Sequence, residues 1–229
     1  MDNFVALNVW NCFLNANYCL DIFQHKLCQN PSCKIFGIVW LFLTHMKLMK
    51  GIREAVGARI LHREMEPVRL RKGFNFNSAD RIGLIYLDRD EKFFRDLNDY
   101  AKFLKENFGI SQVQMLGFVD ENDKKLPAWQ QHRVDSTFIA RKDLNWHFRP
   151  LNGIQNFVSD EFDILIDFSG GNILPLNFVL KESRAKMKVG LRGTRSERYC
   201  DFILNMGEQF GISNFVEQLN SYLSNPKIR

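Results

Sequence analysis

FDILIDFSGGN, at residues 162–172, is the stretch that most directly indicates the fold. Its first seven residues are apolar apart from two aspartates, which is typical of a strand buried on both faces of a parallel sheet. The Ser-Gly-Gly-Asn that follows has turn character, and Pro175 lies where the first turn of a helix would begin. We therefore interpret the stretch as a strand that ends near Asp167, a tight turn, and the start of a helix.

The chain from about Ser78 onward repeats this alternation of strand and helix. Strands are predicted at 81–88, 113–120, 136–140, 162–168, 187–191 and 199–206, and helices at 90–107 and 174–185. Asp90 and Gly109 are typical of the start and end of a helix, and Ser213 is predicted to cap a last one. The inward residues of that last helix are expected to be Phe215, Val216, Leu219, Tyr222 and Leu223. The pattern predicts an α/β fold: a Rossmann-like open, mostly parallel sheet with helices on both faces.

A basic amphipathic helix is predicted before this sheet, at residues 46–66, where Pro67 would end it. Its apolar stripe consists of Leu48, Ile52, Val56, Ile60 and Met65. We favour packing of this stripe on the α/β body, and docking on an anionic membrane or a protein partner is the alternative. Gly51 and Gly57 weaken the helix in either case. The predicted parts are an extension at 1–45, the basic helix and a linker at 46–77, and the Rossmann-like domain at 78–229.

The net charge of +5 comes from a single segment of the 229 residues. Residues 46–72 carry eight Lys or Arg against three Glu, whereas residues 1–45 and 73–229 are each neutral. Binding of nucleic acid requires concentrated cationic charge on the binding surface, so the neutral body argues against a specific nucleic-acid partner. An unknown protein partner or an anionic membrane surface is instead expected to contact residues 46–72.

Residues 1–45 differ from the rest in being rich in Asn, Phe and Cys. Three interpretations stay open: a start codon assigned too early, with translation beginning at Met46 or Met49; a membrane-associating segment; or an ordinary buried element. The apolar run at 35–43 is shorter than the ~20 residues that span a bilayer as a helix.

The cysteines favour a reducing compartment and give no metal site. Cys200 is the single cysteine beyond residue 33, and we expect it to be a small core residue. The C-x4-C pair of Cys28 and Cys33 has no second pair of ligands nearby, so neither a metal nor a cofactor is predicted. The expected location is cytoplasmic, with peripheral attachment to the inner membrane as the alternative.

The candidate site lies at the polar ends of the strands, because ligands of open parallel sheets bind beyond the carboxyl ends. Asp88, Asp120 and Asp167 suit a cation, ribose hydroxyls or general-base catalysis, although an aspartate in this position also commonly caps the next helix. The candidate ligand-binding residues are Asp88, Asp120, Lys142, Asn145, Asp167, Ser169, Gly170, Gly171, Asn172, Arg192 and Arg195. Of these, Lys142, Asn145 and the loop at 192–198 are expected to form a lid.

The turn at 169–172 has two interpretations. Its glycines allow backbone N–H groups to approach an anion, but neither a P-loop nor a dinucleotide fingerprint is present. If the segment only turns the chain, Asp167 should accept hydrogen bonds from nearby backbone N–H groups, and Gly170 or Gly171 should have a positive φ. If it binds a ligand, those N–H groups should face a concavity beside Asn172 and a basic side chain. We favour the turn and keep the anion site as the alternative.

Four stretches stand out: KDLNW at 142–146, FDILID at 162–167, KVG at 188–190 and FVEQ at 215–218. Together they resemble an uncharacterised family of small α/β proteins found in Bacteroidota. The likeness begins near Met46 or Met49 and leaves residues 1–45 outside. That family carries no established activity, so the resemblance implies a fold and little more.

FDILIDFSGGN, the helix after it and the KMKVG strand are also similar to the acceptor-side half of heptosyltransferase-type glycosyltransferases. The first strand here lacks the Gly-Asp loop that carries the base in that family, and this sequence shows no second, nucleotide-sugar-binding domain. The leading hypothesis is a non-enzymatic or regulatory binding module that docks on a partner or membrane surface. The alternative is a sugar- or nucleotide-handling protein, which would bind a small anionic ligand, and whether the chain is an enzyme stays open.

Overall fold

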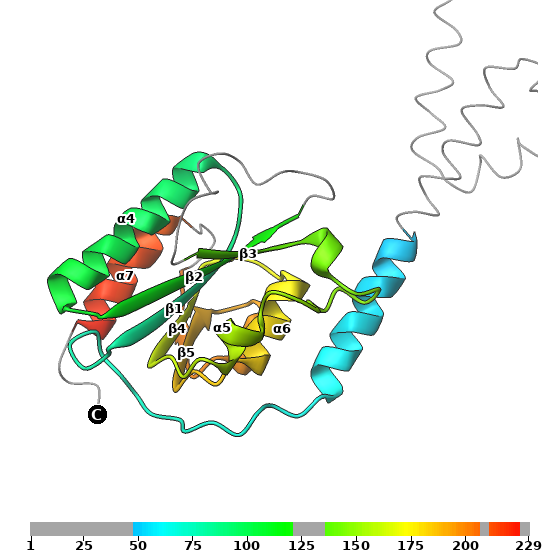
Figure 1. The fold of residues 1–229 in the computed structure, drawn as a ribbon, viewed down its shortest axis with the longest axis horizontal. Coiled ribbons are helices and arrows are strands. Elements are labelled where there is room, and N and C mark those ends of the chain that lie inside the picture. Colours follow the sequence, from blue (N-terminus) through cyan, green and yellow to red (C-terminus); the bar gives the residue numbers. More distant parts are fainter. Residues whose placement is uncertain (1–47, 121–135, 207–210, 225–229) are drawn as a thin grey trace, which may run out of the picture. The chain divides into compact units, whose positions relative to one another are not determined.

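A computed structural model describes residues 48–120, 136–206 and 211–224 of the chain (Figure 1). The chain divides into two compact units, Met1–Ile52 and Arg53–Arg229, and the second contains the whole sheet. The predictions for residues 1–45, including Cys28 and Cys33, lie outside the described residues.

One parallel sheet with the strand order β3-β2-β1-β4-β5-β6 forms the centre of the fold. Its strands are β1 (Arg81–Leu87), β2 (Gln112–Val119), β3 (Ser136–Ala140), β4 (Ile164–Asp167), β5 (Met187–Leu191) and β6 (Phe202–Leu204). The helices are α4 (Glu91–Phe108), α5 (Gln155–Ser159), α6 (Leu174–Glu182) and α7 (Ile212–Leu223), with 3-10 turns η1 (Arg141–Asp143) and η2 (Arg195–Tyr199). The predicted α/β class with a parallel sheet is confirmed.

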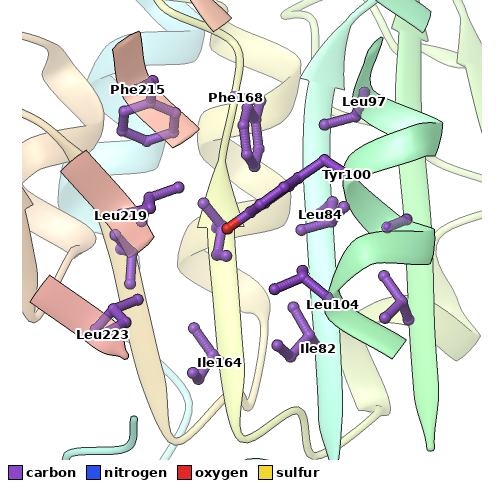
Figure 2. Close-up of a cluster of buried hydrophobic side chains, with 14 of the residues drawn as sticks. Ile82, Leu84, Leu97, Tyr100, Leu104, Ile164, Phe168, Phe215, Leu219 and Leu223 are labelled. Atoms are coloured by element: carbon purple, nitrogen blue, oxygen red, sulfur yellow. The ribbon is translucent and has the colours of Figure 1, made fainter. Parts of the chain in front are cut away.

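Two helices lie on one face of the sheet and bury the larger part of the core. α4 and α7 lie side by side there, and their apolar residues meet those of the strands (Figures 1 and 2). Phe168, which directly follows β4, places its ring 4.9 Å from that of Phe215 and 5.9 Å from that of Tyr100. The opposite face is covered by α5 and α6 through a second apolar cluster that includes Leu165 and Val179. Because side chains alternate along a strand, Asp167 lies on this second face with Leu165.

The helix boundaries predicted from local signals are largely correct. Asp90 is the N-cap of α4 and accepts a hydrogen bond from the backbone N–H of Phe93 at 2.8 Å, while Gly109 ends the helix with a φ of 67°. The cap predicted at Ser213 is wrong, because α7 starts at Ile212 and its N-cap is Gly211, two residues before Ser213. Tyr222 was expected to face inward but is half exposed, and its ring packs against the edge of Phe202.

The strand predicted at 199–206 is wrong in its first residues. Tyr199 belongs to η2, and only Phe202–Leu204 pair with β5. The 3-10 turn is closed by the N–H of Cys200, which donates to the Glu197 carbonyl, and the Glu197 carboxylate accepts from the N–H of Gly193 at 2.8 Å. These local hydrogen bonds override the apolar character of the sequence.

A further helix covers residues 48–63 and ends before Pro67; we call it the basic helix. It packs outside α6, where buried Leu61 contacts Leu174 and Phe178. Of the predicted stripe only Ile60 packs against this cluster, whereas Val56 is 37% exposed and Met65 94% exposed. The packed face is centred on Gly57, where a Cβ atom would lie 2.2 Å from the carbonyl oxygen of His147. A glycine that appeared only to weaken the helix is therefore the point of its closest contact.

Polar groups also attach the basic helix to the sheet-bearing unit. The ammonium of buried Lys181 donates to the carbonyls of Leu61 and Glu64, which have no partner within the helix at its C-terminal end. Near the other end, Arg53 Nε donates to the Trp146 carbonyl at 2.6 Å, and its guanidinium lies 4.5 Å from the ring centre of Phe148. Both contacts agree with the interpretation in which this helix packs on the α/β body.

Replacement of Gly57 tests this docking. Gly57→Ala is expected to lower the free energy of unfolding by about 1–3 kcal/mol, because the added methyl group meets backbone that cannot easily move. Gly51→Ala is the matched control, since a Cβ there has no neighbour within 4 Å and alanine favours a helix over glycine by up to about 1 kcal/mol. Urea unfolding followed by circular dichroism measures both. A Gly57→Ala protein as stable as the Gly51→Ala protein would contradict the contact.

Candidate functional site

The candidate site lies where the strand order reverses. β1 pairs with β4 in the register Ile82↔Ile164 to Ile85↔Asp167, although the two strands are far apart in sequence. From β1 the chain proceeds outward through β2 to β3, and from β4 it proceeds outward the other way through β5 to β6. In open α/β sheets ligands bind in the crevice outside the carboxyl ends at such a switch point. The loops after β1 and β4 meet there.

The loop after β1 does not suit a phosphate. In dinucleotide-binding folds the helix after the first strand directs its N–H groups at the pyrophosphate. Here the carboxylate of Asp90 already accepts from the first turn of α4, and Glu91 adds a second acid to that turn. Asp88 lies just before α4, and the backbone N–H of Asp88 donates to the Phe118 carbonyl at 2.9 Å. The protein's own acids thus occupy the usual anion position.

The loop after β4 has the opposite character. α6 has no acidic residue in its first turn and no side-chain cap, and Pro175 lies in that turn as predicted. Gly170 has a φ of 62°, in the left-handed region that favours glycine, and a Cβ on Gly171 would meet nothing closer than 4.0 Å. Both glycines are partly exposed. Backbone N–H groups are therefore presented without a competing carboxylate on α6.

Two hydrogen bonds join this turn to its neighbours. Arg89 donates from its guanidinium to the carbonyl of Ser169 at 2.9 Å, which links the loops after β1 and β4. The backbone N–H of Arg195 donates to the side-chain carbonyl of Asn172, which links the turn to η2 after β5. Arg89, Arg192 and Arg195 are all exposed. The structure therefore brings a glycine turn, and arginines from two further loops, to one edge of the sheet.

Asp167 is placed beneath this surface rather than on it. Its side chain is 3% exposed, and it accepts a hydrogen bond from the backbone N–H of Ser169 at 2.9 Å. Burial raises the pKa of Asp167, against hydrogen bonds from Ser169 and Ser196 that lower it. This bond and the positive φ of Gly170 are the features predicted for a segment that turns the chain. The turn interpretation therefore describes Asp167 and the equally buried Ser169, while Gly170 and Gly171 are partly exposed and Asn172 is exposed.

The remaining predicted residues lie beyond β2 and β3. Asp120 pairs with Arg141, with 2.5 Å between Oδ1 and Nε. Lys142 is exposed on η1. Asn145 accepts from the N–H groups of His147 and Arg149 at 3.0 and 2.9 Å, so it closes a small hairpin that packs against the basic helix. Asn145 therefore has a structural role in the described contacts, and its use as a lid stays a prediction.

Two functional candidates were missed by sequence reasoning. Arg89 directly follows Asp88 at a strand end, a position from which an arginine can reach across the switch point. Ser196 is fully buried in η2, and its hydroxyl lies 2.7 Å from that of Thr194. No local signal identified Ser196, because its segment was interpreted as part of a loop before a strand.

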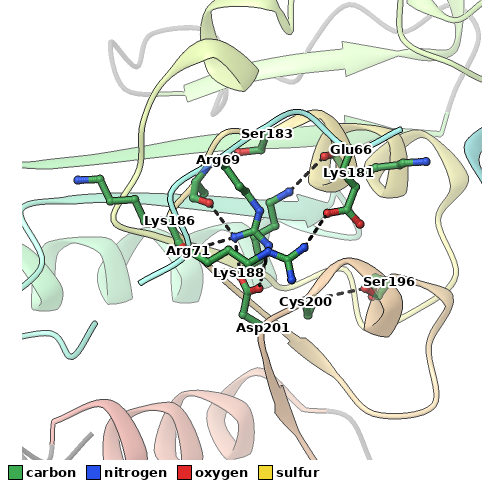
Figure 3. A network of polar contacts seen from close by, with 11 residues as sticks. Glu66, Arg69, Arg71, Lys181, Ser183, Lys186, Lys188, Ser196, Cys200 and Asp201 are labelled. Carbon is green, nitrogen blue, oxygen red and sulfur yellow. Dashed lines mark hydrogen bonds and ion pairs between the residues drawn. The ribbon is translucent and has the colours of Figure 1, made fainter. Parts of the chain in front are cut away.

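Residues 64–72 follow the basic helix, and we call this segment the strap. A second group of titratable side chains lies beside it (Figure 3). Arg69 holds Asp201 with two bonds of 2.8 Å, and Arg71 contacts both Glu66 and Asp201. Lys188, fully buried in β5, donates to the carbonyl of Lys181 at 3.2 Å. Two cations of the basic segment, Arg69 and Arg71, thus attach the strap to Asp201, which directly precedes β6.

Burial, together with the nearby Arg69 guanidinium, lowers the pKa of Lys188 to about 8. Since the unfolded chain keeps this proton up to about pH 10.5, it binds more protons than the folded chain between pH 8 and 10.5. The contribution of Lys188 to stability therefore rises with pH across that interval. Cys200 and Tyr100, whose pKa values burial raises, act in the opposite direction at alkaline pH.

Comparison with a Lys188→Met protein isolates this effect, because the contributions of Cys200 and Tyr100 are common to both proteins. Between pH 7 and pH 9.5 the wild type is expected to gain about 2 kcal/mol of unfolding free energy relative to the variant. Urea titrations at the two pH values measure it. A difference that stays constant would show that Lys188 titrates normally.

Within the described ranges no helix combines the length and the apolar character needed to cross a bilayer. In the same ranges no group of three or more His, Cys, Asp or Glu side chains is arranged to hold a metal ion.

Comparison with known proteins identifies the family. No curated protein and no solved structure was found to match the chain. A family of unknown function, DUF6913, matches residues 53–225, about three quarters of the chain. The match begins at the same residue as the compact unit that carries the sheet. The chain therefore belongs to the family of unknown function DUF6913.

Proposed function

We propose that the chain is a binding module for a small anionic ligand, of the phosphate-bearing class, held at the carboxyl edge of the sheet beside the Gly170–Gly171 turn. The observation that carries the proposal is the linkage of three loops around that turn. The guanidinium of Arg89 bonds to the Ser169 carbonyl, the backbone N–H of Arg195 bonds to the Asn172 side chain, and both arginines are exposed. Guanidinium groups and backbone N–H groups are the donors that proteins use for phosphate.

The two helices that begin at the switch point support an anion at α6 rather than at α4. The first turn of α4 carries Asp90 and Glu91, whose negative charge would repel a phosphate. The first turn of α6 carries no acid, and its preceding residues include the two glycines. The likeness of FDILIDFSGGN to a glycosyltransferase half agrees with a sugar phosphate or nucleotide as the ligand, and it stays a proposal, as does an origin in Bacteroidota.

A second role, docking on an anionic membrane or a protein partner through residues 46–72, is favoured by the outer side of the basic helix. Val56, Arg59 and Arg63 are exposed there, and Met65 and Val68 are almost fully exposed. Sedimentation of the full chain with vesicles of anionic lipid tests this role, and equal sedimentation of an Arg59→Gln/Arg63→Gln protein would exclude it.

The anion site predicts saturable binding of inorganic phosphate, nucleotides or nucleotide-sugars. In a thermal-shift screen a ligand at ~100 times its dissociation constant stabilises the protein by ~2.7 kcal/mol. Arg195→Gln is expected to weaken binding about tenfold or more, because it removes a charge-assisted hydrogen bond. Arg184→Gln is the control: Arg184 is exposed as well, but it follows α6 and precedes β5, at the amino edge of the sheet.

Two results would count against the site. One is the absence of a shift with every ligand in the screen. The other is an equal loss of affinity in the Arg195→Gln and Arg184→Gln proteins, which would indicate a non-specific charge effect rather than a site at the turn.

A further inference from the structure

The strap carries the most exposed large apolar side chains in the described part of the chain. Met65 is 94% exposed, Val68 99% and Leu70 72%, whereas every other large apolar side chain of the described residues is at most 62% exposed. Single exposed apolar residues are common on protein surfaces and require no explanation, but a group of them marks an interaction site. We call these three side chains the apolar edge of the strap.

The exposure of the apolar edge does not come from a loosely held segment. Arg69, which directly precedes Leu70, has a side chain that is only 2% exposed. Its guanidinium donates to both carboxylate oxygens of Asp201 at 2.8 Å and to the Lys186 carbonyl at 3.1 Å. The backbone N–H of Lys72 donates to the same carbonyl at 3.2 Å. The strap is therefore attached to the sheet-bearing unit by residues that point inward, and this attachment holds the apolar edge outward.

Positive charge flanks the apolar edge on both sides. Arg63 precedes it at the end of the basic helix, Arg71 and Lys72 follow it, and all three are exposed. The two acids of the strap already have cationic partners: Glu64 pairs at 2.7 Å with an arginine of the hairpin that packs against the basic helix, and Glu66 pairs with Arg71 at 3.2 Å. An apolar centre flanked by cations is complementary to a surface with an apolar interior and negatively charged groups at its boundary.

We propose that the strap docks on the surface of an anionic lipid bilayer, with the apolar edge inserted at the boundary between headgroups and acyl chains and the flanking cations on the lipid phosphates. The inference deepens the second role proposed above and rests on it. Peripheral segments bind bilayers through this combination of apolar burial and electrostatic attraction. The apolar edge supplies the first contribution, and Arg63, Arg71 and Lys72 supply the second.

A bilayer suits this surface better than a second copy of the chain or a protein partner. Two copies that met through the apolar edge in a two-fold interface would bring like charges close together, because the flanking cations of each copy would face those of the other. Protein interfaces are centred on aromatic side chains and arginines that fill shaped pockets. The strap has no aromatic residue, and Arg69 at its middle is directed inward. Flexible aliphatic side chains need only a fluid apolar phase.

Sedimentation of the full chain with phosphatidylcholine vesicles, prepared with and without phosphatidylglycerol, tests the inference. The wild type is expected to bind the anionic vesicles about tenfold or more tightly than the neutral ones, because each cation near an anionic surface contributes about fivefold in affinity.

Val68→Ser/Leu70→Ser is expected to weaken binding to the anionic vesicles by about tenfold or more, because the burial of apolar carbon is lost. Leu151→Ser is the matched control: Leu151 is 53% exposed and lies outside the strap, so its replacement should leave binding unchanged. Val68→Trp is expected to bind more tightly than the wild type, since tryptophan favours the bilayer interface. All of these side chains are exposed, and equal thermal melting by circular dichroism verifies that the fold is kept.

The outcomes separate this inference from the roles proposed above. If Val68→Ser/Leu70→Ser binds as tightly as the wild type while Arg59→Gln/Arg63→Gln binds less, docking through charge stands and insertion of the apolar edge is wrong. If the wild type binds neither kind of vesicle, or both equally, the anionic bilayer is wrong as the partner. Phosphate binding at the turn before α6 is measured without vesicles, so none of these results bears on the anion site.

Discussion

The pairing of β1 with β4 is the constraint on which the remaining structure depends. It places Ile85 beside Asp167 and so brings two loops together that are distant in sequence. Each half of the sheet then extends outward from this pair, and the connecting helices cover the two faces as right-handed crossovers require. The position of the candidate site follows from this arrangement. β1 and β4 are adjacent strands whose following connections run to opposite halves of the sheet, and ligands of open α/β sheets bind at such a point.

Buried polar side chains act mainly as attachments between elements in this protein. Lys188 bonds the carbonyl end of α6, and Lys181 of α6 bonds the carbonyl end of the basic helix, so each of these two helices ends on a buried ammonium group. A cation at that end of a helix also interacts favourably with the helix dipole. Asp167 has a comparable role at the opposite edge of the sheet, where it accepts the N–H of Ser169 and fixes the turn before α6. The candidate site thus lies on a support whose buried polar groups already have hydrogen-bond partners.

Much of the fold was predictable from the sequence because its signals are local. The apolar runs of β1 and β4, the Asp90 cap and the Gly109 terminus each depend on a few adjacent residues. The packed face of the basic helix was not predictable, since it depends on the approach of His147 to Gly57 from a distant loop. The burial of Asp167 was likewise not predictable. The sequence around a strand-end aspartate is the same whether or not a later segment such as η2 covers its side chain. Arg89 could be predicted as a site residue only from the strand order. The strand order cannot be deduced from any short segment of the sequence.

Amide chemical-shift mapping during titration with inorganic phosphate tests the central claim most directly, namely that the turn before α6 is an anion site. The structure predicts saturable shifts confined to the loops after β1, β4 and β5, with the largest at Gly170, Gly171 and Arg195. Shifts concentrated in the basic helix, or shifts that grow linearly over the whole surface without saturation, would contradict it.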